Sequence, residues 1–163
     1  MCHQPLCGLL TLDPLPQGLG VTGHQRLDLV TCLSCVGWSE PVLFFQHDLS
    51  GEASMIGELS EQQPQFPEEP FPETQVGLVP TPSRWKWQAW EGNLHRLGGE
   101  PTWLQRAEYS TCPQCERTMP LLMQLGDGLP SGKRRSWDWG SGGIAYVCWC
   151  DTCSISATFW QCT

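Results

Sequence analysis

The chain has 163 residues, of which 40% are hydrophobic, and it carries 10 cysteines, 9 tryptophans and a formal net charge of −8. This length suits one domain, or two small halves that share a core. The acidic balance argues against a nucleic-acid-binding module, which needs a basic surface, and no apolar run is long enough to span a membrane.

The negative charge is concentrated in the first half of the chain. Residues 1–83 hold ten acidic residues and one basic residue, Arg26, whereas residues 84–163 are nearly balanced. Such a surface favours a basic protein partner through long-range attraction, although acidity can also serve solubility alone. The acidic residues that we expect at a partner-binding surface are Glu40, Asp48, Glu52, Glu58, Glu61, Glu68, Glu69 and Glu73.

The first twenty residues do not have the pattern of a secretory signal peptide. They hold no Lys or Arg, and three prolines interrupt their apolar stretch. This pattern predicts a cytoplasmic protein. In a reducing compartment cysteines serve as free thiols or metal ligands more often than as disulfides. We therefore expect metal binding, with a disulfide framework as the alternative.

Residues 1–58 are predicted to form an N-terminal β-unit. Residues 27–31 and 42–46 are typical of short strands, and they flank the sequence Cys32-Leu-Ser-Cys35. Residues 47–51, which include Asp48 and Gly51, are typical of a turn. Residues 59–83 are rich in Pro and Glu, which predicts a connecting loop. Its apolar residues are expected to pack along the domain; they are Phe66, Phe71, Val76, Leu78 and Val79. A strip that binds a partner is the alternative.

Residues 84–163 are predicted to form a second β-unit, and the two units together form one compact domain. Strands are expected at residues 85–87, 121–125, 137–139, 144–150 and 154–162, and a mobile loop at 126–135. No segment has helical periodicity over three turns. The fold class is therefore mainly β with little helix, built from antiparallel sheets. Each half has a Cys-x-x-Cys motif followed by an apolar strand, which hints at two related units.

Two Cys-x-x-Cys motifs of the second half predict a structural zinc site. They are Cys112-Pro-Gln-Cys115 and Cys150-Asp-Thr-Cys153, and each forms a tight turn that presents two sulfurs. Four thiolates complete a tetrahedral zinc shell and leave no position for a catalytic water. Buried free thiols and a redox motif are the alternatives, but no βαβ pattern surrounds the motifs. Cys148 and Cys162 are expected to be packed thiols.

A second zinc site is a further possibility in the first half. Cys32 and Cys35 need two more ligands, and Cys2 and Cys7 would complete the set, with His3, His24 and His47 as substitutes. The alternative is an empty pair of reduced thiols.

No catalytic motif is present in the sequence. There is no phosphate-binding loop, no Gly-x-Ser-x-Gly and no His-Glu-x-x-His, so we expect a protein without enzymatic activity. Trp103, Trp149 and Trp160 lie in apolar contexts typical of a core. The basis for a nucleic-acid site is limited to one tryptophan cluster and one basic run, which comprise Trp85, Trp87, Trp90 and residues 133–135.

The order of several motifs resembles a known family. Residues 97–105 contain Gly-Gly-Glu-Pro-Thr-Trp. The motif Cys112-Pro-Gln-Cys115 comes next and is followed by residues 119–124. The segment Trp139-Gly-Ser-Gly-Gly-Ile-Ala-Tyr146 then precedes the motif Cys150-Asp-Thr-Cys153. This order resembles the YwqG-like family of bacterial proteins of unknown function. It is more distantly similar to eukaryotic programmed cell death protein two and its relatives. The similarity is close over residues 94–163 and loose over residues 25–50.

The resemblance implies a β-rich fold, a structural zinc and no known catalytic residues. Relatives of the bacterial family occur near toxin genes, which implies immunity to a toxin, whereas the eukaryotic relatives are chaperones of a ribosomal protein. We therefore expect a zinc-stabilised protein that binds another protein, most concretely an immunity protein. A chaperone or adaptor for a basic client is the alternative, followed by a nucleic-acid-binding zinc module.

Overall fold

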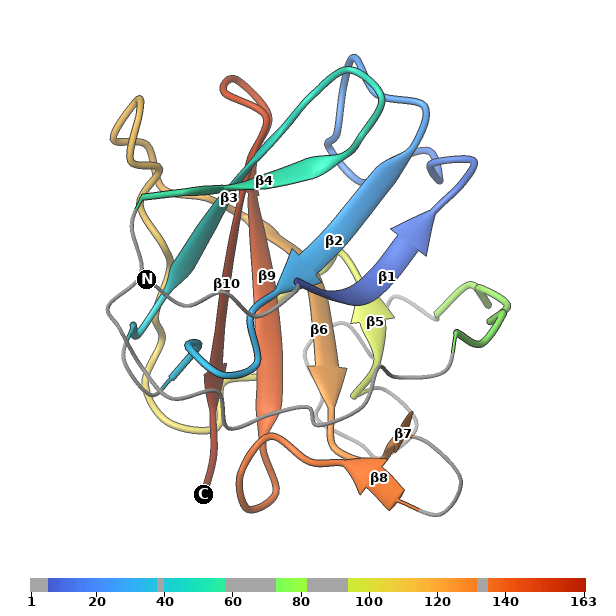
Figure 1. Ribbon diagram of the computed structural model, residues 1–163, viewed down its shortest axis with the longest axis vertical. Coiled ribbons are helices and arrows are strands. Elements are labelled where there is room, and N and C mark those ends of the chain that lie inside the picture. Colours follow the sequence, from blue (N-terminus) through green and yellow to red (C-terminus); the bar gives the residue numbers. More distant parts are fainter. Residues whose placement is uncertain (1–5, 38–39, 58–72, 82–93, 132–134) are drawn as a thin grey trace.

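The computed structural model describes residues 6–37, 40–57, 73–81, 94–131 and 135–163, and these ranges contain strands but no helix (Figure 1). The mainly β fold class is therefore confirmed. The strands are β1 (Cys7–Leu12), β2 (Leu27–Thr31), β3 (Leu43–His47), β4 (Ala53–Ile56), β5 (Arg96–Leu97), β6 (Leu121–Gly126), β7 (Leu129–Ser131), β8 (Arg135–Trp137), β9 (Ile144–Cys150) and β10 (Ile155–Gln161). No helix in the described part of the chain has the length and apolarity needed to cross a membrane.

A six-stranded sheet in the order β4-β3-β10-β9-β6-β5 dominates the fold, and all its pairings are antiparallel. The β9–β10 hairpin occupies its centre, with Tyr146 opposite Phe159. Every residue of β9 is buried, and so is all of β10 except Trp160. Strand β9 is a continuous apolar run, as expected of a strand that is covered on two faces, whereas β10 also buries the polar residues Ser156, Thr158 and Gln161. Two further two-stranded sheets are β1–β2 and β7–β8.

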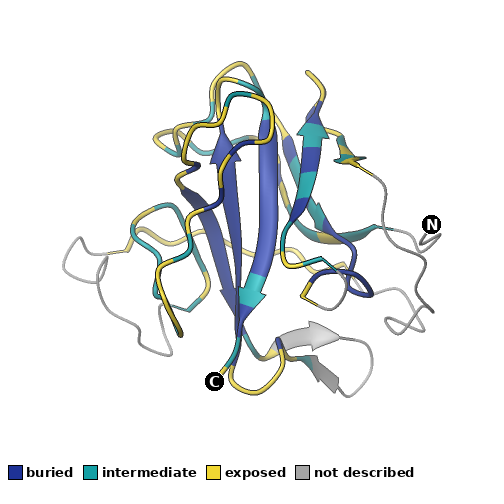
Figure 2. Cartoon of the chain, turned by 90° about the vertical axis from the view of Figure 1, so that its left-hand side faces the viewer, coloured by how far each residue is buried: buried dark blue, intermediate teal, exposed yellow. Residues whose placement is uncertain are grey.

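Each face of the large sheet has its own hydrophobic cluster. The long central strands are buried along almost their whole length, as the dark blue in Figure 2 shows. On one face Tyr146, Cys148 and Phe159 pack with Trp103 and Met119 from the irregular segment that precedes β6. On the opposite face the cluster joins β2 to β6 and β9, and it comprises Leu27, Leu29, Leu122, Met123, Leu125, Val147 and Trp149. The sheet β1–β2 therefore forms a second layer, and the irregular segment forms a third.

The two halves of the sequence contribute to the same sheet. Strands β3 and β4 come from the predicted N-terminal unit, and β3 pairs with β10 of the predicted C-terminal unit. Strands β3 and β6, each of which follows a Cys-x-x-Cys motif, lie on either side of the β9–β10 hairpin. Most of the connecting segment, including Phe66 and Phe71, lies outside the described residues. In its described part, residues 73–81, Val76, Leu78 and Val79 are more than half exposed and do not pack as expected.

Several strands differ from the prediction. The expected strand at 137–139 ends at Trp137, because the carboxylate of Asp127 accepts the backbone N–H groups of Trp139 and of Gly143 and curls this segment into a loop. The loop expected at 126–135 contains β7, which pairs with β8. Strands β1, β4 and β5 were not predicted, and the expected strand at 85–87 lies outside the described residues.

Candidate metal centre

The Cys-x-x-Cys motif formed by Cys112 and Cys115 lies at the turn of a narrow antiparallel loop. Thr111 and Thr118 form a bridge, and the N–H of Cys112 donates to the carbonyl of Arg117 at 2.9 Å. The N–H of Glu116 donates to the carbonyl of Cys112, also at 2.9 Å. Glu116 has a positive φ of 59°, which reverses the chain directly after Cys115. This tight turn places the two cysteine side chains on the same side.

The second motif is the turn of the central hairpin. Cys150 is the last residue of β9 and pairs with Ile155, the first residue of β10. The N–H of Cys153 donates to the carbonyl of Cys150 at 3.3 Å, and Ser154 has a positive φ of 53°. Both motifs therefore place a left-handed residue directly after the second cysteine. This conformation costs a non-Gly residue energy, so its presence in both turns indicates a shared geometry.

The fold brings the four cysteines of the two motifs together. The sulfurs of Cys112, Cys115, Cys150 and Cys153 all lie within 4.8 Å of one another, and those of Cys115 and Cys150 are 3.5 Å apart. Cys112 and Cys150 are buried, whereas Cys115 and Cys153 are half-exposed. None of the nine described cysteines forms a disulfide. The cluster could hold a metal ion, as the spacing of the motifs predicts.

The thiols of this cluster have shifted pKa values of opposite sign. The backbone N–H of Arg117 lowers the pKa of Cys115 to about 7. Burial, together with the neighbouring thiols, raises the pKa of Cys153 to about 12. Four sulfurs at this separation cannot all carry a negative charge without a compensating cation. The donor set is therefore chemically suited to a bound cation that would keep all four deprotonated.

Residues from the first half of the chain hold the second motif in place. The carboxylate of Asp151 accepts two hydrogen bonds from Thr22, from its N–H and its hydroxyl, both at 2.6 Å. His24 Nε2 lies 3.0 Å from the hydroxyl of Ser154. Gln46 Nε2 donates to the carbonyl of Cys153 at 2.8 Å. These contacts could not be predicted from local sequence patterns, because the partners are more than one hundred residues apart.

The predicted second metal site remains a prediction. The N–H of Val36 donates to the carbonyl of Cys32 at 3.0 Å, which is the same turn as in the first motif. Burial, together with nearby Cys32, raises the pKa of Cys7 to about 11. Cys7, Cys32 and Cys35 do not form a metal-compatible group within the described ranges, and Cys2 and His3 lie outside them.

The substitute ligands considered for the second site lie elsewhere. His24 and His47 contact the indole ring of Trp149 edge-on, with ring centroids 5.7 and 5.2 Å from it. Trp149 is buried as expected, and Trp103 and Trp160 are half-buried. Cys148 is fully buried outside the four-cysteine cluster, and burial raises its pKa to about 11. It is therefore a core thiol, as expected.

The predicted acidic surface is described only in part. Asp48 and Glu52 are exposed at the β3–β4 turn, Glu73 is exposed and Glu40 is half-buried. The carboxylate of Asp48 also closes its own turn, because it accepts the N–H of Ser50 at 2.8 Å and that of Glu52 at 3.1 Å. The other residues of this prediction, Glu58, Glu61, Glu68 and Glu69, lie outside the described residues, as do Trp85, Trp87, Trp90, Lys133 and Arg134.

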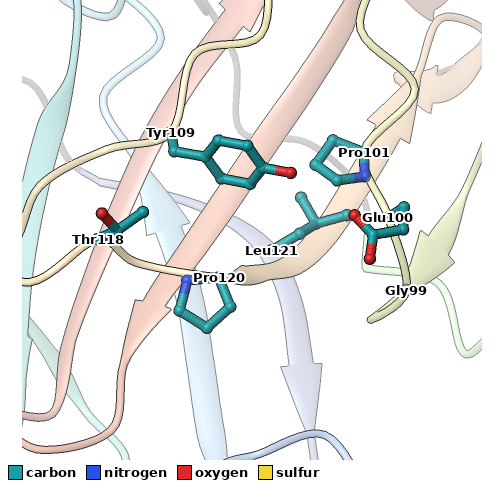
Figure 3. A pocket seen from close by; sticks show the side chains of 7 residues that line it. All are labelled: Gly99, Glu100, Pro101, Tyr109, Thr118, Pro120 and Leu121. Carbon is teal, nitrogen blue, oxygen red and sulfur yellow. The ribbon is translucent and has the colours of Figure 1, made fainter.

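A shallow pocket of about 310 Å³ lies beside the start of β6 (Figure 3). Tyr109, Pro101 and Leu121 face one another across it, and Glu100 contributes its charged group. Among the described residues that line it there is no His, Cys, Lys or Arg. Glu100 is the one charged residue of this wall, so the pocket offers no cationic group for an anionic ligand, and we assign it no function.

Comparison with known proteins yields one distant similarity. The chain is 28% identical over 171 aligned positions to the uncharacterized protein YpfL of Salmonella typhimurium, and the alignment covers 98% of this chain. It spans 38% of the length of that relative. No family model matches the chain, and no solved structure matches it.

Proposed function

We propose that this protein is a non-enzymatic protein-binding protein with a zinc-stabilised fold, and most concretely an immunity protein that neutralises a bacterial toxin. The observation that carries the proposal is a combination of two features. One is the closed cluster of four cysteines at the β9–β10 turn. The other is the exposed pair Asp48 and Glu52 in the half of the chain that holds ten acidic residues against one base.

Zinc is the metal that fits the cluster best. Thiolates select soft or borderline cations over Mg²⁺ or Ca²⁺, and four of them suit the tetrahedral shell of structural zinc. A tetrahedron with Zn–S bonds of about 2.3 Å separates its sulfurs by about 3.8 Å. The sulfur–sulfur separations in the structure, 3.5 Å for one pair and at most 4.8 Å for all pairs, bracket this value. Cys112, Cys115, Cys150 and Cys153 would hold the ion, which would supply stability and not catalysis.

The charge of the surface supports a basic partner. Negative groups on one protein raise the rate of association with a positive surface and disfavour acidic competitors. The lack of disulfides among the nine described cysteines agrees with a cytoplasmic site of action, where such a partner would be neutralised.

Co-expression with the products of the genes that flank this one, tested for a toxin among them, tests the proposal. We expect a stable complex after purification and survival of cells that otherwise die. The complex should weaken as salt rises, because exposed charges are screened. If the toxin does not bind and cells are not protected, the immunity function is wrong. If instead a housekeeping protein of basic character, such as a ribosomal protein, forms a stoichiometric complex, the protein is a chaperone or adaptor.

A further inference from the structure

Strand β4 forms one end of the six-stranded sheet, in the hairpin at the top of Figure 1. Its register with β3 pairs Ser54 with Gln46 and Ile56 with Phe44. The N–H of Asp48 donates to the carbonyl of Glu52 at 3.1 Å, which fixes the alternation of hydrogen-bonded pairs along the hairpin. Ser54 and Ile56 therefore direct their backbone groups towards β3.

The alternate residues of β4 direct their backbone groups away from the sheet. In an antiparallel pair, residues at non-hydrogen-bonded positions point their N–H and C=O groups outward. His47, which lies opposite Ala53, occupies such a position. Its N–H points away from β4 and donates to the carbonyl of Ser154, on the β10 side, at 2.9 Å. Ala53 and Met55 therefore offer their N–H and C=O groups at the open side of β4.

Within the described residues, this edge lacks the usual protection against a further strand beyond Gly51, whose carbonyl already accepts the N–H of Asp28 at 2.9 Å. Sheet edges are commonly blocked by a charged side chain, a proline or a bulge. The sequence of β4, Ala-Ser-Met-Ile, has neither a charge nor a proline, and its pairing with β3 is regular. Two exposed apolar side chains accompany it, namely Leu49 at the hairpin tip, which is 86% exposed, and Ile56, which is 37% exposed.

The charges around the hairpin determine which kind of strand can be added. Asp48 and Glu52 are exposed at its turn. The neighbouring base, Arg26, forms a salt bridge with Asp28 at 3.0 Å and also interacts with Glu52, but one positive charge offsets only part of the charge of these three acids. A second copy of this chain would bring the same acids close together, which costs energy. An extended segment with Lys or Arg would instead pair its side chains with these acids.

We propose that the open edge of β4 is the site where an extended basic segment of the partner protein docks as an additional strand. This inference rests on the proposed protein-binding function and assigns its surface. Hydrogen bonds to Ala53 and Met55 would give affinity, contacts with Leu49 and Ile56 would bury apolar area, and the acids of the turn would select basic sequences.

Selection from a displayed library of random linear seven-residue peptides tests the proposal with the full chain. We expect enriched peptides to carry Lys or Arg. A synthetic copy of one should bind with slower hydrogen exchange at the amides of Ala53 and Met55. Met55→Pro removes one outward N–H group and should weaken binding at least about tenfold, whereas Met55→Leu keeps this group and should bind like the wild type.

A charge-matched pair of variants gives a second measurement that is independent of the proline. Glu52→Lys and Asp138→Lys change the net charge equally, but Asp138 lies beside β8, far from β4 in the fold. Only Glu52→Lys should weaken the peptide at least about tenfold, with thermal melts to confirm that both variants fold. The proposal is overturned if no basic peptide is enriched, if both variants bind equally, or if the open edge instead forms a dimer of this chain.

The toxin complex separates this inference from the proposed function. If the toxin binds Met55→Pro and Glu52→Lys as tightly as it binds the wild type, the immunity function stands and the β4 site is wrong. If basic peptides bind at β4 while the toxin does not bind at all, the β4 site stands and the immunity function is wrong.

Discussion

His47 is a buried imidazole that the fold holds in its neutral form. Its Nε2 atom lies 2.8 Å from the hydroxyl of Ser156, and Trp149 packs edge-on against its ring. Burial lowers the pKa of His47 to about 4, from about 6.5 in an unfolded chain. Between these two values the unfolded state binds more protons than the folded state, so stability is full above about pH 6.5 and declines as the pH falls.

Because of His47, we expect the unfolding free energy to fall by about 2 kcal/mol when the pH is lowered from 7 to 5. Urea unfolding of the wild type and of His47→Gln at both pH values measures it. The variant should be less stable at pH 7 but should lose less stability on acidification. Equal losses in the two proteins would show that His47 does not cause the decline.

Gly143 is a position where a side chain has no room. A Cβ atom there would lie 1.7 Å from the carbonyl oxygen of Trp139, which is backbone and cannot move aside. Its neighbour Gly142 has a positive φ of 64°, but a Cβ atom there would meet nothing closer than 3.5 Å. Gly143→Ala should therefore lower the unfolding free energy by about 3 kcal/mol or more, and Gly142→Ala by about 1 kcal/mol. Thermal or urea unfolding of both variants gives the order, and the reverse order would contradict this account.

At the scale of elements, two buried glutamines fasten the irregular segment that covers the sheet. Gln161 of β10 accepts the N–H groups of Leu104 and Gln105 at 3.2 and 3.1 Å and donates to the carbonyl of Arg106 at 2.9 Å. Gln124 of β6 accepts the N–H of Thr102 at 3.0 Å in the same way. Residues 102–106 of this segment do not pair with a described strand, so these side chains satisfy backbone groups that a sheet would otherwise satisfy.

Gln161→Leu should release this segment from the sheet. It removes three hydrogen bonds at a partly buried site, and we expect a loss of about 1–3 kcal/mol in unfolding free energy. Gln105→Leu is the matched control, because Gln105 is exposed and its single hydrogen bond to the carbonyl of Cys162 can be replaced by water. Faster hydrogen exchange at the amides of Leu104 and Gln105 should accompany the first variant alone. Equal stability of the two variants would contradict the role of Gln161.

The elements that could be predicted from the sequence are those whose pattern is local. Strand β2 alternates buried and half-buried residues, and β9 is one apolar run, so both were predicted at their observed bounds. Strand β4 is four residues long and lies at an edge, where apolar and polar residues do not need to alternate. The prediction of a strand at 137–139 was wrong, because the carboxylate of Asp127 accepts hydrogen bonds from the backbone N–H groups of Trp139 and Gly143.

The same distinction applies to the candidate site. The four cysteines could be predicted because each pair is separated by two residues, and the turn that joins a pair is local. The contacts of Thr22, His24 and Gln46 with the second motif depend on the folding of the first half onto the hairpin, and the sequence carries no signal for them. For this reason the sequence indicated two β-units, whereas the structure has one sheet shared by both.

At the scale of the whole molecule, the four-cysteine cluster links regions that are far apart in the chain. It joins the loop before β6 to the turn of the central hairpin, and this turn is in contact with residues of the first half. The binding free energy of a structural zinc is about 10–16 kcal/mol in small zinc proteins, which is comparable with the whole stability of a domain, about 5–15 kcal/mol. Loss of the ion should therefore unfold the sheet as a unit.

Removal of the metal gives the corresponding prediction. The purified protein should contain zinc by elemental analysis, and a strong chelator should abolish its cooperative thermal transition. Cys153→Ser should have the same effect and lower the zinc content by one ion per chain. Cys162→Ser is the control, because Cys162 lies outside the cluster, and this variant should keep both metal and transition. A Cys32→Ser variant that also loses one ion would establish the second site, whereas an intact transition in metal-free protein would show that packing alone stabilises the fold.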